Sequence, residues 1–197
     1  MGTSTNQPSP RRDPSWMAAR AALGSTVLPL ERQSQEIWRA AISDPIADLQ
    51  NSLSSSAVSA AVGIANASPD PQSAIRAFGE RLLKNAEASL FTEIARRALT
   101  RALLANKGGQ GFAAELFAET AAYYVSRDLP SVIGGPGRVQ NTSSAMALKR
   151  AFTDVARSAA LGAAQESPIF GVSDRPSAGA WKAYVRRVLT ALVGESP

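Results

Sequence analysis

Apolar side chains recur every three or four residues along most of this chain, and no segment alternates strictly between apolar and polar positions. The first spacing places apolar side chains on one face of an α-helix, whereas alternation would indicate a β-strand. Leu30, Ile37, Trp38 and Ile42 follow the helical spacing, and a second helix is expected to begin at Pro45. The pattern therefore predicts an all-α fold.

The longest helical pattern without a proline runs from 72 to 106, after a loop and helix start at 68–73. Its apolar stripe begins near Phe78 and moves around the helix axis to Leu99, because steps of four residues overshoot a turn of about 3.6 residues. A straight helix cannot keep such a stripe against one neighbour. We expect the helix to bend, to break near Asn85, or to meet different neighbours along its length.

Glycine and proline separate the remaining helices. The segment at 107–111, KGGQG, is expected to close the long helix, and an antiparallel helix then ends before Pro130. A glycine-rich loop leads to a helix at about 142–165 and to a final helix that carries Trp181 and Tyr184. The expected architecture is a single-domain bundle of about five to seven helices.

The N-terminal segment has a different composition. Residues 1–14 contain several prolines and, after the initiator, no hydrophobic residue, so they cannot bury apolar area. We predict a disordered tail at 1–14 and an α-helical domain at 15–197. A subdivision of this domain near 130–141 is an alternative.

The chain contains no histidine and no cysteine. This composition excludes imidazole bases, thiolate nucleophiles and the commonest metal ligands, and we find no nucleophile motif. We therefore expect no catalytic residue, no metal site, no cofactor and no enzymatic activity. Glu115 and Glu119 lie one helical turn apart without the histidine that a di-iron site needs, and should balance the basic helix before them. An unconventional carboxylate-based enzyme is the remaining catalytic alternative.

Most of the positive charge is expected on solvated helix faces. The net charge is +5, the surplus lies after residue 70, and all but four of the 21 cations are arginine. Acidic residues three or four positions away compensate several of these arginines. The expected ion pairs join Glu93 to Arg96 and Arg97, and Asp154 to Arg150 and Arg157. Arg101 and Lys107 are expected to be unpaired.

The last helix differs because no acidic residue occurs between Asp174 and Glu195. Its cations could contact phosphates while Trp181 and Tyr184 stack on bases. The alternative is that the helix dipole favours cations near the C-terminus and that both aromatic side chains belong to the core. The candidate nucleic-acid-binding residues are Arg101, Lys107, Lys182, Arg186 and Arg187.

A glycine-rich motif, GGPGR, precedes the helix at about 142–165. Backbone amides of such a loop, together with a helix N-terminus, can hold an anion. The candidate anion-binding residues are Gly134, Gly135, Gly137 and Arg138. A flexible connection explains the same composition, because the proline removes an amide donor and no phosphate-loop lysine follows.

The segment at 53–67 is uncharged and rich in alanine and serine, so it can pack closely against another helix of this chain or of a partner. We therefore expect a non-catalytic assembly subunit that docks through apolar and small-residue helix faces onto a protein partner or a second copy. Direct binding of nucleic acid is the alternative. No apolar run approaches the roughly 20 residues of a membrane span, and we expect a cytoplasmic location.

Overall fold

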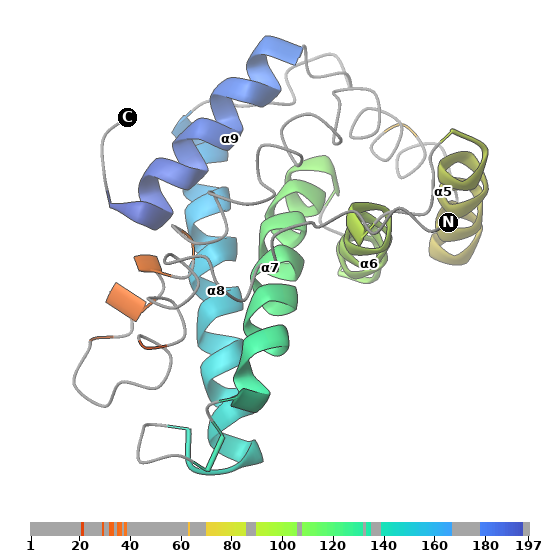
Figure 1. Ribbon diagram of the computed structural model, residues 1–197. Helices are drawn as coiled ribbons and strands as arrows, with labels where there is room; N and C mark the ends of the chain where they lie inside the picture. The colour runs from red at the N-terminus through yellow and green to blue at the C-terminus, as the bar shows by residue number, and fades with distance from the viewer. Residues whose placement is uncertain are drawn as a thin grey trace, which may run out of the picture.

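The computed structural model describes residues 21, 29, 32, 33, 35, 36, 38, 63, 70–85, 90–105, 108–131, 133–134, 139–166 and 178–194. Within them the structure is helical and contains no strand, which confirms the all-α fold (Figure 1). The helices are α5 (Pro71–Asn85), α6 (Leu90–Leu104), α7 (Gly108–Asp128), α8 (Thr142–Glu166) and α9 (Ala178–Val193), with a short 3-10 helix, η3 (Leu129–Ser131).

Three expectations fall outside these residues or are not tested by them. The predicted disordered tail at 1–14 lies outside the described part of the chain, and so does the uncharged helix at 53–67, apart from Gly63. The division into a tail and a domain at 15–197 stays a prediction. In the described residues, no helix has both the length and the apolar character that crossing a membrane requires.

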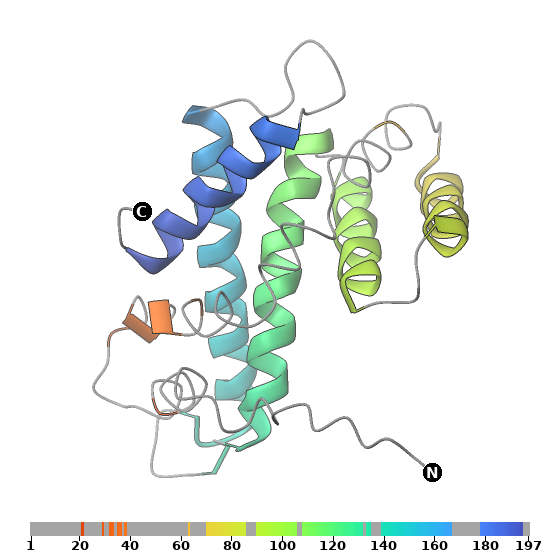
Figure 2. The ribbon, with the colours of Figure 1, turned by 45° about the horizontal axis from the view of Figure 1, so that its top comes forward.

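Helix α7 forms the centre of the bundle. Figures 1 and 2 show it between α6 and α8, and it packs extensively against both, while α5 packs on α6 and α9 on α8. Every residue from Gly111 to Ala122 is buried. A helix with neighbours on several sides is buried around its circumference and not on one face alone.

Aromatic side chains from three segments meet beside α7. The Phe117 ring lies 6.2 Å from Trp38 and 6.1 Å from Tyr184, and Trp181 lies 5.6 Å from Tyr184. All four side chains are buried. The Tyr184 hydroxyl donates a hydrogen bond to the main-chain oxygen of Ala160 at 3.0 Å, and burial raises its pKa. The core interpretation of Trp181 and Tyr184 is confirmed, so neither ring offers a surface on which bases could stack.

The long pattern at 72–106 breaks where expected. Helix α5 ends at Asn85 and α6 begins at Leu90. Asp70 caps α5, because its carboxylate accepts hydrogen bonds from the amides of Gln72 at 2.9 Å and Ser73 at 3.0 Å, and Pro71 occupies the first turn. The hydrogen bonds from Ser73 and Gln72 lower the pKa of Asp70. The break gives α5 and α6 different orientations, which accommodates the migrating apolar stripe.

The sequence predicted that the glycine segment at 107–111 would close the preceding helix, but most of this segment belongs to the next helix. Gly108 to Gly111 form the first turn of α7, and the connection from Leu104 is correspondingly short. Such a short connection between two helices that pack side by side reverses the chain, which confirms the antiparallel arrangement (Figure 2). Glycine weakens a helix by about 1 kcal/mol per residue, and tertiary packing of a buried helix overrides this preference.

Local caps define the other two helices. Asn141 accepts a hydrogen bond from the Ser144 amide at 2.9 Å, and Ser144 Oγ accepts one from the Asn141 amide at 3.1 Å. This reciprocal cap fixes the start of α8 close to the predicted position. Helix α9 ends at Val193. Gly194 follows it, adopts φ 73° and donates its amide to the Thr190 oxygen at 2.9 Å.

Candidate functional site

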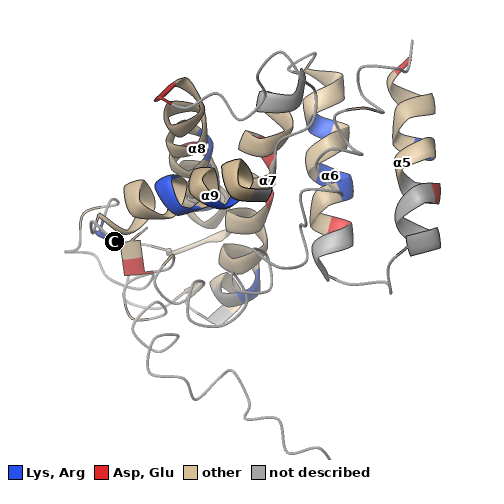
Figure 3. Ribbon diagram, turned by 90° about the horizontal axis from the view of Figure 1, so that it is seen from above, with Lys and Arg blue, Asp and Glu red and all other residues tan. Residues whose placement is uncertain are grey.

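The exposed half of α9 carries three cations and no acidic residue. Lys182 and Arg186 lie one turn apart on one flank, Arg187 lies on the other, and all three are exposed. Their side chains form no hydrogen bond or ion pair with any residue that the structure describes. Figure 3 looks down on this helix and shows basic positions without an acidic one. The helix therefore presents uncompensated positive charge.

Helix α6 contains the ion pairs that its sequence spacing predicts. Glu93 accepts hydrogen bonds from Arg96 Nε and Nη2, both at 2.8 Å, and from Arg97 Nε at 2.9 Å. These contacts, first from Arg96 and then from Arg97, lower the pKa of Glu93 to about 2. The same carboxylate raises the pKa of Arg96. The pairs with Glu93 are confirmed.

Arg101 is paired, contrary to the prediction. Its Nε lies 2.6 Å from Oε1 of Glu119, whose side chain is 5 % exposed. That oxygen accepts no hydrogen bond, so the contact is an ion pair without hydrogen-bond alignment. Spacing along one helix could not reveal it, because Glu119 lies on α7. Lys107 lies outside the described residues.

Glu115 pairs with α8, whereas the sequence predicted that it balances the basic helix before it. Its carboxylate accepts two hydrogen bonds from Arg157 of α8, from Nε at 2.9 Å and from Nη2 at 3.1 Å. Arg157 also contacts Asp154 at 2.6 Å, as predicted, and the hydrogen bond to Glu115 raises its pKa. Glu119 therefore balances the basic helix α6, as expected, whereas Glu115 joins α7 to α8. In the described part of the chain, no three acidic, histidine or cysteine residues gather as metal ligands would.

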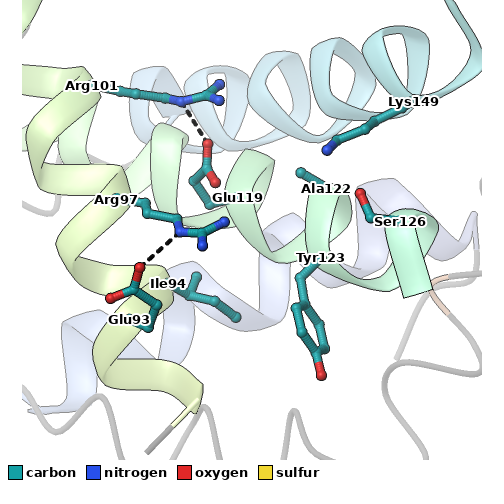
Figure 4. Close-up of a pocket in the computed structure, with 9 residues that line it drawn as sticks. All are labelled: Glu93, Ile94, Arg97, Arg101, Glu119, Ala122, Tyr123, Ser126 and Lys149. Carbon is teal, nitrogen blue, oxygen red and sulfur yellow. Dashed lines mark hydrogen bonds and ion pairs between the residues drawn. The ribbon is translucent and has the colours of Figure 1, made fainter. Parts of the chain in front are cut away.

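A polar cleft of about 200 Å³ opens between α6, α7 and α8. Figure 4 shows Arg97 and Arg101 reaching into it from α6 and Lys149 reaching toward them from α8. Glu119 and Ala122 of α7 lie between these side chains. The remaining lining residues are Glu93, Ile94, Tyr123 and Ser126. This cleft was not predicted from the sequence, although the one-turn spacing of Arg97 and Arg101 was a usable signal.

The glycine-rich loop is described only in part. Gly134 adopts φ 79° and donates its amide to the Val139 oxygen at 2.9 Å. At the start of α8 the Ser144 amide is likewise occupied by Asn141. Gly135, Gly137 and Arg138 lie outside the described residues, so the anion-binding loop stays a prediction.

Comparison with protein-family models, with curated proteins and with solved structures finds no match to this chain. The functional proposals therefore depend on the chain's own residues.

Proposed function

We propose that this chain is a non-catalytic α-helical interaction subunit whose basic α9 face binds nucleic acid. The observation that carries the proposal is the uncompensated charge of Lys182, Arg186 and Arg187. Arg97 and Arg157, by contrast, sit against carboxylates, whereas the isolated exposed arginines Arg76 and Arg150 form no ion pair with a described residue. The non-catalytic part of the proposal is supported by the absence of histidine and cysteine from the sequence.

The chemistry of this surface suits the phosphate backbone of nucleic acid. A guanidinium group presents parallel N–H donors that match two phosphate oxygens, and Arg186 and Arg187 stand on opposite flanks of the exposed half of α9. Since Trp181 and Tyr184 are buried, these rings cannot stack on bases, and the contacts we propose for this face are those of Lys182, Arg186 and Arg187 with phosphates. Binding should therefore be insensitive to base sequence.

The test measures the affinity for a fluorescent duplex DNA and a single-stranded RNA by anisotropy, over a range of salt concentrations. Three phosphate contacts predict a slope of log affinity against log salt of about −3 on duplex DNA. The variant R186E/R187E should weaken binding by more than about tenfold. The matched control R76E/R150E makes the same change in net charge at two exposed arginines of α5 and α8, and should change affinity by less than about threefold.

Two results would reject the proposal. Binding that does not depend on salt would exclude phosphate contacts as its source. An equal loss in R186E/R187E and R76E/R150E would attribute binding to net charge instead of the α9 face.

A second candidate function, docking of a protein partner or a second copy, is favoured by two exposed apolar side chains. Leu104 at the end of α6 is 72 % exposed and Met146 in the first turns of α8 is 68 % exposed. Large apolar side chains at this exposure are common at protein interfaces when they belong to a wider patch. Light scattering after size exclusion should show a mass above 20.6 kDa that does not respond to salt and falls in L104S/M146S. An unchanged mass in that variant would rule out these side chains as the contact.

A further inference from the structure

The polar cleft between α6, α7 and α8 is lined by two arginines whose guanidinium groups are positioned by carboxylates. These guanidinium groups keep N–H donors that a ligand could use. Arg97 donates a hydrogen bond to Glu93 through Nε, and Arg101 approaches Glu119 with its Nε at 2.6 Å, while the Nη groups of neither arginine donate a hydrogen bond to a described residue. Each carboxylate therefore fixes one edge of a guanidinium and leaves its Nη groups without a partner among the described residues. In Figure 4 these groups extend over the cleft toward the amine of Lys149.

The charges around the cleft do not balance. Arg97, Arg101 and Lys149 line the cleft together with the carboxylates of Glu93 and Glu119, so cations exceed carboxylates by one, and Glu93 is shared with Arg96 outside the cleft. Lys149 is half-buried and makes no ion pair with a described residue. An anionic ligand in the cleft would supply the counterion that Lys149 lacks among the described residues.

We propose that this cleft binds the terminal phosphate of a small phosphomonoester. A terminal phosphate is close to a dianion at neutral pH, since its second pKa is about 6, and it would give Lys149 and the Nη groups of Arg97 and Arg101 an anionic partner. Its three oxygens can accept hydrogen bonds from the Nη groups of Arg97 and Arg101 and from Lys149. The proposal is independent of the α9 face, because no residue of α9 lines the cleft.

The size of the cleft favours a small ligand. Its volume of about 200 Å³ is below the roughly 300 Å³ at which sites for drug-sized molecules begin. Ile94 and Ala122 give it an apolar wall, and the Ser126 hydroxyl lies at its edge. A phosphate with a short organic substituent fits this combination, with the phosphate against the cations and the substituent against the apolar wall.

The test is a titration of ¹⁵N-labelled protein with methyl phosphate, followed by amide shifts at constant ionic strength. Shifts should saturate and concentrate around Arg97, Arg101 and Lys149. The variant K149Q should weaken binding about tenfold, equivalent to about 1.4 kcal/mol, whereas R150Q, the adjacent exposed cation outside the cleft, should stay within about twofold. Dimethyl phosphate, a monoanion like the backbone of nucleic acid, should bind about tenfold more weakly.

A second variant guards against a folding defect in K149Q. R97Q removes an exposed side chain whose partner Glu93 retains Arg96, and it should also weaken binding about tenfold while the thermal midpoint stays near that of the native chain. The α9 variant R186E/R187E should bind methyl phosphate normally, which separates this site from the proposed nucleic-acid surface.

Three results would overturn the proposal. The first is an absence of saturable shifts up to about 10 mM methyl phosphate. The second is an equal loss of affinity in K149Q and R150Q, which would indicate diffuse attraction. The third is equal affinity for dimethyl phosphate, which would show that the cleft does not select a dianion.

Discussion

Replacing Arg157 with methionine removes the guanidinium that contacts the buried carboxylate of Glu115, while it keeps an unbranched apolar side chain of similar length. The pair is bidentate, with contacts of 2.9 and 3.1 Å, and the Glu115 side chain is 4 % exposed. Removal of Arg157 takes a bidentate charged partner from a buried carboxylate in a region of low dielectric constant. We expect R157M to destabilise the protein strongly.

The magnitude follows from the burial of the two partners. Breaking a fully buried ion pair costs about 3–5 kcal/mol, and the Arg157 side chain is 23 % exposed, so we expect the lower end, about 3 kcal/mol. Its second partner, Asp154, is 56 % exposed and contributes less than about 1 kcal/mol. In a protein of this size, a loss of about 3 kcal/mol corresponds to a fall in Tm of about 6–12 °C.

Urea unfolding followed by circular dichroism measures the effect, with D154N as the control for the exposed contact. The variant E115L/R157M replaces the whole pair with apolar side chains and should recover stability to within about 1 kcal/mol of the native chain. A loss below about 1 kcal/mol in R157M would show that water reaches Glu115. A double variant as unstable as R157M would show that the loss of the contact between Arg157 and the Glu115 carboxylate is not the cause.

Two further changes test a cap and an exposed ion-pair cluster. Gly194 has φ 73°, where an alanine costs about 1–2 kcal/mol. The variant G194A should therefore lower the urea midpoint without changing the m-value. An unchanged midpoint would contradict the left-handed cap. Glu93 has a folded pKa of about 2, below its ordinary 4.5, so its contribution is present above that ordinary value and is lost as the pH falls through about 2. The Glu93, Arg96 and Arg97 side chains are about half exposed, so E93Q should cost less than about 1 kcal/mol at neutral pH and nothing near pH 2. If E93Q remains less stable than the native chain near pH 2, the charge of Glu93 is not the source of the stabilisation.

Local features of the fold were predictable because neighbouring residues produce them. The Glu93 pairs follow from helix spacing, the start of α5 from Asp70 and Pro71, and the break after Asn85 from a drifting apolar stripe. Each of these depends on geometry within about one or two turns of a helix. The first turn of α7 shows the limit, since its glycines favour a loop locally and become helical only in a packed bundle.

The candidate sites also divide into features of a single helix, which could be predicted, and contacts between helices, which could not. The basic face of α9 could be predicted, because the apolar stripe of one helix and the absence of acids within it are both visible in the sequence. The Arg101–Glu119 and Arg157–Glu115 pairs could not, since each joins two helices. Arg101 was expected to be free because the nearest acid along the chain is compensated by other arginines.

By itself, the sequence determined that this protein is helical, approximately where most of its helices begin and end, and which cations lack an acid within one turn, since these properties arise from backbone hydrogen bonding and side-chain spacing within a few residues. The tertiary structure decided that α7 is buried all round from Gly111 to Ala122, that the two buried carboxylates of this helix pair with opposite neighbours, and that three cations converge on one cleft. Contacts between helices depend on how each helix is rotated and aligned against the next, and this alignment is set by the packing of the whole core.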